Sequence, residues 1–358
     1  MITLLYYNTM LNKYSTFIIS IFTATLLTFS NLNAEVKVVA SIKPIHSLVS
    51  YVMDGVGKPS IIVDGSNSPH NFNLKPSNAK DIENADIIFW VGEDIESFLE
   101  KPLKSISKKA KIIEMMDIKG INKLKFRERN IFEEHEGHDD HGHGKKDKHD
   151  DHGHGKKDKH DDHGHGKKDK HDDHGHGKKD KQDDHEHGHA HGEYDPHIWL
   201  DPHNAEVMVE EIAKQLAAID PQNAAVYKKN SKNAIKDIEK LIKETKKDMK
   251  KGISYIVFHD AYQYFEKEFN VSALGALTLN TDVAPGAKQI SEIKEIIEHE
   301  NVKCLFSEPQ FNPDIIKSIA KGTNVKIGVL DPLGANLDNG KELYFKLIKD
   351  ISSSLKKC

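Results

Sequence analysis

The sequence predicts an α/β protein of two similar lobes, each built on a parallel sheet and joined by one long rigid helix. Two observations indicate the fold. In both halves, short continuous apolar runs alternate with amphipathic segments, as expected of parallel strands covered on both faces. Between the halves lies one unusually long segment of helical periodicity, residues 221–251.

The first 34 residues have the pattern of a cleaved signal peptide. Lys13 precedes an apolar run at Phe17–Phe29, and the small residue Ala34 closes the stretch before charge begins. The run is too short to span a membrane comfortably, which argues against the alternative of a membrane anchor. We therefore expect cleavage after Ala34 and a mature protein outside the cytoplasm.

The N-terminal lobe is expected to span residues 35–220. Four apolar runs predict its strands, at Val36–Ala40, Ser60–Val63, Asp86–Val91 and Lys111–Met115. Helical patterns separate the first three: one at Ile45–Met53, which two glycines end, and one that Ser77 can cap and that continues to Asn84.

Residues 135–191 interrupt this lobe and cannot form a core. A unit of eleven residues, HGHGKKDKHDD, begins at His141 and recurs until the copy that begins at His174. Glycine and charged residues without apolar ones cannot offset the entropy lost on folding. We predict a disordered insertion here.

Helices dominate the stretch that follows. Asp201 followed by Pro202 is typical of a helix start, and the pattern continues to Ile219. The linker helix at residues 221–251 carries apolar residues at spacings of three and four along one face, and Gly252 ends it. A single apolar stripe on so long a helix favours a strut between lobes.

The C-terminal lobe, residues 252–358, repeats the theme of the first. Its strands are expected at Ser254–Phe258, Val271–Ala276, Val302–Phe306 and Val325–Leu330. Helical patterns lie between them, for example at Ala287–Glu300 and Pro313–Lys321. The net charge of −5, with acids and bases in balance, does not suggest a nucleic-acid partner.

Four side chains that suit a metal are predicted near the carboxyl ends of strands, where open parallel sheets bind ligands. They are His70, His197, His259 and Asp331, and we expect them to form a metal site in the cleft between the lobes. Zinc accepts three imidazoles plus a carboxylate or water in tetrahedral geometry. Each residue has a simpler reading, because a lone loop histidine is usually only solvated and Asp331, which precedes a proline, can serve a turn.

Several segments resemble the ZnuA family, the periplasmic zinc-binding proteins of ABC uptake systems. They are SIKPIHSLVS, SPHNFNLKPS, DPHIWLDP, FHDAYQYFEKEF, CLFSEPQF and LDPLG, together with the His-rich insertion. The resemblance implies that His70, His197 and His259 bind the metal, and that the fourth ligand is Asp331 or water. Some zinc members have an acidic residue where this chain has Pro69.

The resemblance also implies a periplasmic monomer that captures zinc, the transported ligand, and delivers it to a membrane permease with its cytoplasmic ATPase. Relatives often carry a disulfide at the positions of Cys304 and Cys358, which are the only cysteines here. A bridge is therefore expected in an oxidising compartment.

Three other functions are weighed against this one: a manganese-binding relative, a zinc buffer without a transporter, and a secreted zinc hydrolase. The only H-E-x-x-H match, at residues 185–189, falls in the His-rich insertion, which has no helical pattern, and the chain has no G-x-S-x-G motif, so we expect no enzyme. The insertion is read as a low-affinity zinc collector, because H-x-H pairs place imidazoles within chelating reach. An inert linker is the alternative.

Overall fold

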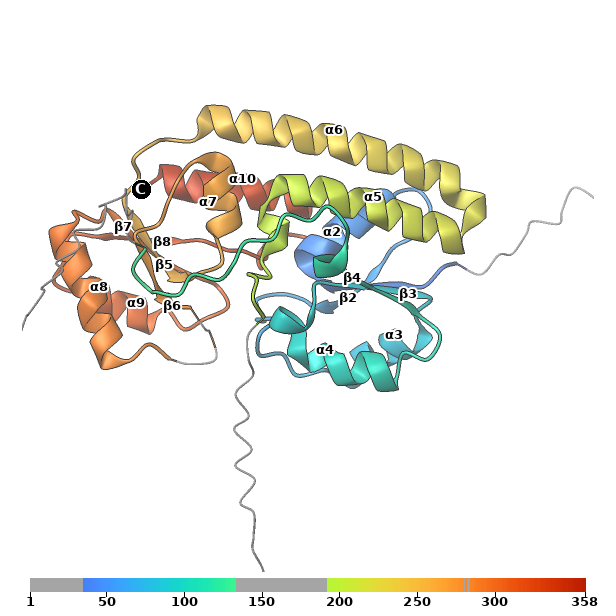
Figure 1. Ribbon diagram of the computed structural model, residues 1–358, viewed down its shortest axis with the longest axis horizontal. Helices are drawn as coiled ribbons and strands as arrows, with labels where there is room; N and C mark the ends of the chain where they lie inside the picture. The colour runs from blue at the N-terminus through green and yellow to red at the C-terminus, as the bar shows by residue number, and fades with distance from the viewer. Residues whose placement is uncertain (1–34, 133–191, 280, 282–283) are drawn as a thin grey trace, which may run out of the picture. The chain divides into compact units, whose positions relative to one another are not determined.

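The computed structural model describes residues 35–132, 192–279, 281 and 284–358 (Figure 1). This part of the chain contains two four-stranded parallel sheets with helices beside them, which confirms the predicted fold class. The predicted signal peptide, residues 1–34, and the predicted disordered insertion, residues 135–191, lie outside the described residues. No helix of the described part is long and apolar enough to cross a membrane.

The first sheet has the strand order β2-β1-β3-β4. Its strands are β1 (Val38–Ile42), β2 (Ser60–Val63), β3 (Ile87–Trp90) and β4 (Lys111–Glu114). Its helices are α2 (Lys43–Val52), α3 (Pro76–Asn84) and α4 (Glu93–Ser105), and a 3-10 turn, η1 (Met115–Asp117), follows β4. The central strands β1 and β3 are buried throughout, which explains why their sequences are continuously apolar.

Two local expectations in this lobe need correction. Ser77 does not cap α3, because the helix already begins at Pro76 and Lys75 is the N-cap. Proline suits the first helical position, where its missing N–H is not needed. Helix α4 was not predicted at all, since Pro102 and several charged residues obscure its apolar face.

The second sheet has the corresponding order, β6-β5-β7-β8. Its strands are β5 (Tyr255–His259), β6 (Gly275–Thr278), β7 (Cys304–Ser307) and β8 (Lys326–Val329). Its helices are α7 (Gln263–Phe269), α8 (Ala287–His299) and α9 (Asp314–Ala320). Strand β6 begins later than the predicted Val271–Ala276, because Asn270 ends α7 in a left-handed conformation and the next residues form the connection.

The remaining helices are η2 (Ile198–Leu200), α5 (Pro202–Ile219), η3 (Pro221–Asn223), α6 (Ala224–Asp248) and α10 (Leu343–Lys356). The predicted linker helix at residues 221–251 is thus a 3-10 turn followed by α6, which ends at Asp248. Its apolar stripe packs against α5, α2 and α10, beside which it runs in Figure 1. The stripe is therefore a packing face along neighbouring helices.

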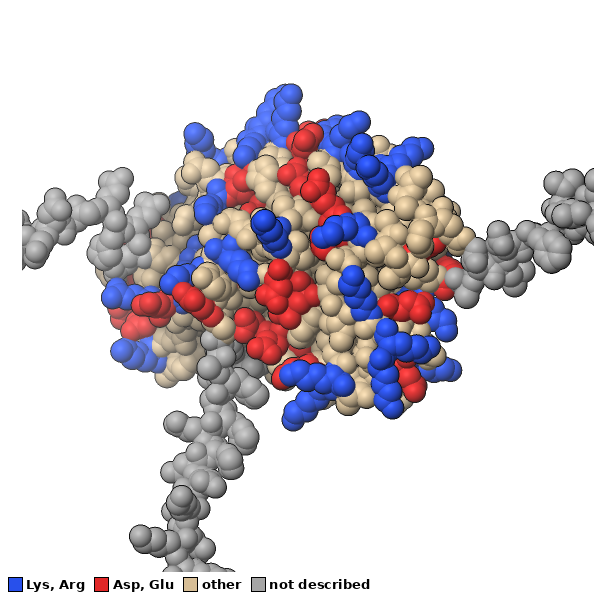
Figure 2. All heavy atoms as spheres, turned by 45° about the vertical axis from the view of Figure 1, so that its right-hand side comes forward, with Lys and Arg blue, Asp and Glu red and all other residues tan. Residues whose placement is uncertain are grey.

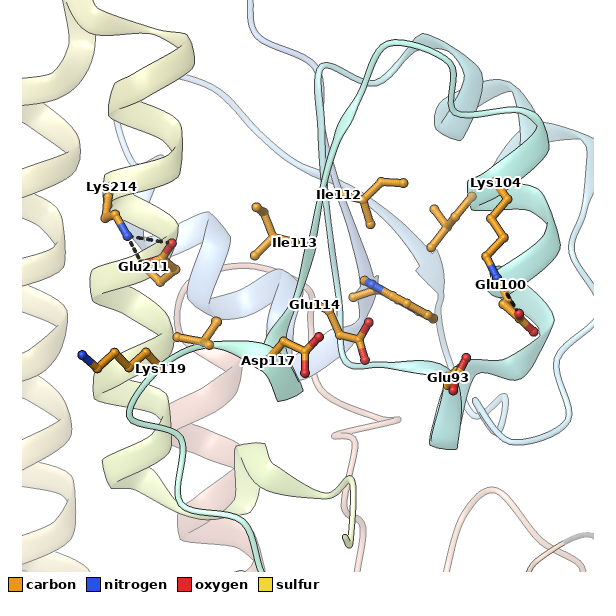
Figure 3. Close-up of a pocket in the computed structure, with 13 residues that line it drawn as sticks. Glu93, Glu100, Lys104, Ile112, Ile113, Glu114, Asp117, Lys119, Glu211 and Lys214 are labelled. Atoms are coloured by element: carbon orange, nitrogen blue, oxygen red, sulfur yellow. Dashed lines mark hydrogen bonds and ion pairs between the residues drawn. The ribbon is translucent and has the colours of Figure 1, made fainter. Parts of the chain in front are cut away.

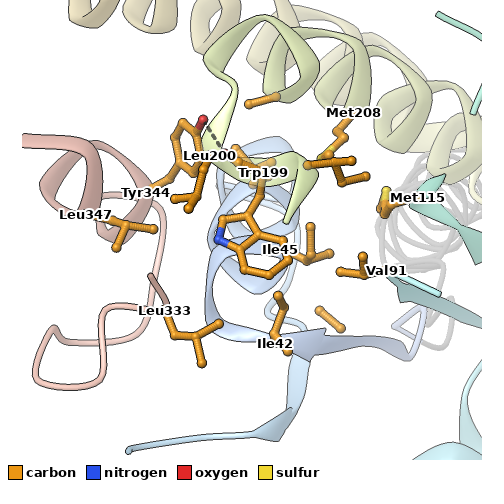
Figure 4. Packing of buried hydrophobic residues seen from close by; sticks show 14 of the residues in the cluster. Ile42, Ile45, Val91, Met115, Trp199, Leu200, Met208, Leu333, Tyr344 and Leu347 are labelled. Atoms are coloured by element: carbon orange, nitrogen blue, oxygen red, sulfur yellow. Dashed lines mark hydrogen bonds between the residues drawn. The ribbon is translucent and has the colours of Figure 1, made fainter. Parts of the chain in front are cut away.

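The buried side chain of Trp199 connects the segment before α5 to other parts of the molecule. Its side chain is fully buried, and Figure 4 shows it among Ile42, Ile45 and Leu333. Its indole Nε1 donates to the carbonyl of Pro332 at 2.8 Å, and its own carbonyl accepts from the Tyr344 hydroxyl at 2.9 Å. Trp199 therefore joins the first lobe to the C-terminal segment, two residues from His197.

Candidate metal centre

Three histidines from distant parts of the sequence converge. His70 lies in the loop after β2, His197 directly precedes η2, and His259 is the last residue of β5. Each offers a nitrogen atom, and these three atoms all lie within 4.8 Å of one another. In the described part of the chain, no other set of three histidine, cysteine or acidic side chains is this close. The structure thus brings together the three histidines that the sequence singled out.

The spacing of two of these nitrogens suits a tetrahedral metal ion. His197 Nε2 and His259 Nε2 are 3.3 Å apart. Two imidazoles bound to one tetrahedral zinc ion through bonds of about 2.0–2.1 Å would have nitrogens about 3.3–3.4 Å apart. Both side chains are buried, so the two nitrogens face each other away from bulk water.

Buried carboxylates hold the other ring nitrogen of each of these histidines. His197 Nδ1 lies 2.6 Å from Asp195 Oδ1, and His259 Nδ1 lies 2.7 Å from Glu308 Oε1. A neutral imidazole that donates from Nδ1 presents the lone pair of Nε2. Two lone pairs that face each other repel, so a cation or a proton between them stabilises the arrangement. Carboxylate–histidine pairs of this kind orient metal ligands in proteins.

The environment of His259 acts on its proton affinity in two opposing directions. Burial lowers its pKa, but the charge and hydrogen bond of Glu308, together with the charges of Asp260 and Asp195, raise it, and the result is a pKa above the ordinary value. A metal ion must displace this proton, because only neutral imidazole is a ligand.

The walls of the site are mostly apolar. The histidines line a small cavity together with Pro69, Ile95, Trp199, Phe311 and Leu333, among others. Apolar walls exclude water and strengthen electrostatic interactions inside the cavity. A small site of this kind fits a single ion with three protein nitrogens and leaves one tetrahedral position for another ligand.

Asp331, the fourth predicted ligand, is engaged in a turn. Its carboxylate accepts hydrogen bonds from the backbone N–H groups of Leu333, Gly334 and Ala335 at 3.0, 3.0 and 2.6 Å, and from Gln310 Nε2 at 3.0 Å. It does not belong to the group of ligand atoms within 4.8 Å. The fourth ligand stays a prediction, either Asp331 or water.

Sequence reasoning did not assign the two supporting carboxylates. Asp195 lies two residues before His197, a spacing that could have drawn attention to it. Glu308 follows β7, which pairs with β5 in the sheet, and only this pairing places it beside His259.

A larger cavity, of about 560 Å³, lies away from the histidines, between α4, β4 and α5 (Figure 3). It is lined by Glu93, Glu114, Asp117 and Ile112, among others. Burial and the nearby Asp117 raise the pKa of Glu114 to about 7. Because its carboxylates do not form a group with metal-binding spacing, we assign no ion to it.

The surface charge is mixed. On the face shown in Figure 2, basic side chains are distributed around a central gathering of acidic ones. A continuous basic surface of the kind that binds nucleic acid is not seen on this face.

Comparisons with known proteins agree along the length of the chain. A family model described as "Zinc-uptake complex component A periplasmic" matches residues 38–358. A curated protein of Brucella abortus (strain 2308), named high-affinity zinc uptake system protein ZnuA, is 47% identical over 351 residues, which cover 98% of this chain and 99% of the relative.

Two solved structures share the fold at lower identity. One, described as the crystal structure of ZnuA, superimposes with a TM-score of 0.64 at 20% identity, covering 89% of this chain and 99% of the other. The other is a manganese-bound periplasmic metal-binding protein from Candidatus Liberibacter asiaticus, with a TM-score of 0.62 at 21% identity, covering 90% of this chain and 97% of the other.

Proposed function

The chain belongs to the family of periplasmic zinc-uptake components, and from this premise we propose that it captures zinc in the periplasm and delivers it to the membrane permease of an ABC importer. The permease works with a cytoplasmic ATPase. Members of the family are transport components and not enzymes, as the sequence predicted. The observation that carries the proposal is the convergence of His70, His197 and His259 within 4.8 Å.

The donor set supports zinc as the transported ion. Three imidazole nitrogens suit zinc, whereas manganese prefers oxygen ligands. The carboxylates of Asp195 and Glu308 can balance the two positive charges of the ion through the imidazoles that they hold. We propose His70, His197 and His259 as ligands, with Asp331 or water in the fourth position.

Manganese is the second candidate, because a protein of the same fold is described as manganese-bound. Competition titration with a chromophoric chelator, done separately with zinc and manganese, distinguishes the two ions. We expect one tight zinc ion in a protein that lacks residues 135–191, and much weaker manganese binding. Equal or tighter manganese binding would overturn the assignment of the ion.

Delivery to a permease is tested in cells. Zinc-limited cells that carry both this protein and the permease should take up labelled zinc faster than cells that lack either one. If uptake needs the protein but not the permease, the chain is a zinc buffer and the delivery proposal is wrong.

We propose further that residues 135–191 collect zinc at low affinity. This segment lies outside the described residues, and its support is its sequence, which alternates histidine with glycine and has aspartate nearby. We also propose cleavage after Ala34, a monomer, and lobes at residues 35–220 and 252–358 with the linker helix between them.

A further inference from the structure

Residues 122–132, here called the connecting segment, follow the first sheet in sequence. Their first part contacts residues 193–204, and their second part contacts the second lobe. Asn130 accepts from the backbone N–H of Ala276 at 2.8 Å, and Phe132 donates to the carbonyl of Leu274 at 2.9 Å. The segment thus pairs with the outer side of β6. A side chain at Gly275 would approach the carbonyl of Asn130 to 2.5 Å, so glycine permits this contact.

The same segment touches the residues that support the metal centre. The carbonyl of Leu124 accepts from the backbone N–H of Asp195 at 2.8 Å. The side chain of Gln263 bridges the segment to this carboxylate: its amide nitrogen lies 3.2 Å from the carbonyl of Lys125 and 2.6 Å from Asp195 Oδ2. The connecting segment therefore contacts Asp195, the residue whose carboxylate holds Nδ1 of His197.

Arg127, in the middle of the segment, holds two carboxylates that are almost completely buried. One guanidinium nitrogen donates to Asp260 Oδ1 at 2.6 Å, and the other donates to Glu266 Oε2. Side-chain exposure is 4% for Asp260 and 3% for Glu266, against 24% for Arg127. The guanidinium also lies 4.0 Å from the centre of the Phe132 ring. Within the described residues, neither carboxylate has another ion-pair partner.

The two ion pairs of Arg127, here called the clamp, lie at the turn that directly follows His259. Asp260 is the next residue in the chain, and its backbone N–H donates to the carbonyl of Thr278 at 3.2 Å. Glu266 lies in α7, directly after the turn, and its other oxygen accepts from the hydroxyl of Tyr255 at 3.1 Å. Arg127 thus connects the residue after His259 to the helix that follows the turn, and Glu308 holds the ring of His259.

We propose that Arg127 is a positioning residue of the metal centre, which sets the place of His259 through Asp260 and Glu266 without touching the ion. This inference rests on the proposed zinc-binding function and extends it. A planar guanidinium can bind two carboxylates at once, which a lysine ammonium on a flexible stem cannot do with the same geometry. Loss of the clamp leaves two buried carboxylates without a counter-charge, and the turn shifts.

The experiment compares Arg127→Gln and Arg127→Lys with the parent protein. A matched control is Lys125→Gln, two residues away in the same segment, whose ammonium pairs with Glu193 at an exposed position. Zinc affinity is measured by chelator competition, and the visible absorption of the cobalt-substituted protein reports the geometry of the ligands. The melting temperature without metal is recorded for each variant.

For Arg127→Gln we expect zinc affinity to fall by about tenfold, the lower end of the 10–100-fold cost typical of outer-shell partners, with altered cobalt bands. Arg127→Lys should keep part of the zinc affinity and have cobalt bands closer to those of the parent. Lys125→Gln should have the zinc affinity and cobalt bands of the parent. A lower melting temperature with unchanged zinc affinity and cobalt bands would mean a purely structural role and would overturn the proposal.

If Arg127→Gln does not fold, the decision falls to Arg127→Lys, which keeps the charge. Weaker zinc binding and altered cobalt bands in that variant support positioning, and parental values for both refute it. A parent protein that binds no zinc would overturn the proposed function itself, and with it this inference.

Discussion

At the scale of single residues, the properties of the candidate centre depend on histidine–carboxylate pairs. His197 and His259 each have a carboxylate on one ring nitrogen and face each other through the other nitrogen. The carboxylate favours one tautomer and one direction of the ring, so that Nε2 would present its lone pair to the proposed ion without a change of rotamer. This arrangement predicts that the identity of the residue at position 259 controls which metal is preferred.

His259→Ala should weaken zinc binding by about 3 kcal/mol or more, roughly two orders of magnitude in Kd, because one of three nitrogen donors is lost. His259→Glu should lose less zinc affinity and gain relative manganese affinity, since carboxylate oxygen suits manganese. Chelator competition in a background that lacks residues 135–191 measures both. His203→Ala is the control, because His203 is exposed and contacts Glu206 and Glu268. Parental zinc affinity in His259→Ala would remove His259 from the ligand set.

Glu96 predicts a pH dependence of stability. Its side chain is fully buried, and burial raises its pKa to about 7, although the backbone N–H groups of Val91 and Gly92 favour the charged form. Between the unfolded pKa near 4.5 and about 7, the folded state keeps a proton that the unfolded state loses. Stability should therefore fall as pH rises through this window, by on the order of 3 kcal/mol, and level off above it.

Glu96→Gln should remove this component. Urea unfolding of the parent and the variant, measured from pH 4.5 to 8, gives the difference in the free energy of unfolding at each pH. We expect the free energy of unfolding of the variant to increase relative to that of the parent as pH rises. A difference that does not change with pH would show that Glu96 titrates alike in both states.

At the scale of elements, the C-terminal helix α10 is held at both ends. Near its start, the backbone N–H of Tyr344 donates to Ser47 Oγ of α2 at 2.9 Å. After its end, Cys358 forms a disulfide with Cys304 of β7, with Cα atoms 5.7 Å apart. The bond expected from the two cysteines thus attaches the last residue of the chain to the central part of the second sheet.

Replacing both cysteines by alanine should lower the free energy of unfolding by roughly 4 kcal/mol at most, since the bond links residues 54 apart in sequence and restricts the unfolded chain. Zinc affinity should change little, because neither cysteine contacts the three histidines. Urea unfolding of the oxidised parent, the reduced parent and the double variant measures the effect. Two free thiols in the denatured, unreduced parent would contradict the bond.

At the scale of the whole molecule, two sheets of the same strand order supply the centre together. The first contributes His70, the second contributes His259, and the segment between them contributes His197. Trp199 is hydrogen-bonded to the carbonyl of Pro332 in the loop after β8, and both residues line the small cavity that holds the three histidines. All of the contacts described here are made by residues outside 135–191.

A protein in which a short Gly-Ser linker replaces residues 135–191 should therefore keep one tight zinc ion and bind fewer zinc ions in total. Equilibrium dialysis gives the number of ions, and chelator competition gives the affinity of the tight one. A linker of equal length in which the histidines are replaced by serine is the control for chain length. Loss of the tight ion in both proteins would show that the histidine-rich segment helps to build the centre.

The sequence by itself predicted the fold class and most strands to within a few residues, and it singled out the three histidines that the structure brings together. These depend on local signals: continuous apolar runs, helix caps and side chains at strand ends. It did not predict α4, whose proline and charged residues obscure its periodicity.

Tertiary structure alone decided which side chains support the histidines. Glu308 reaches His259 because β5 and β7 are neighbours in the sheet, and Arg127 reaches Asp260 because the connecting segment pairs with β6. It also showed the carboxylate of Asp331 engaged by its own turn. Such contacts depend on strand pairing and chain crossing, which join residues far apart in sequence and leave no local pattern.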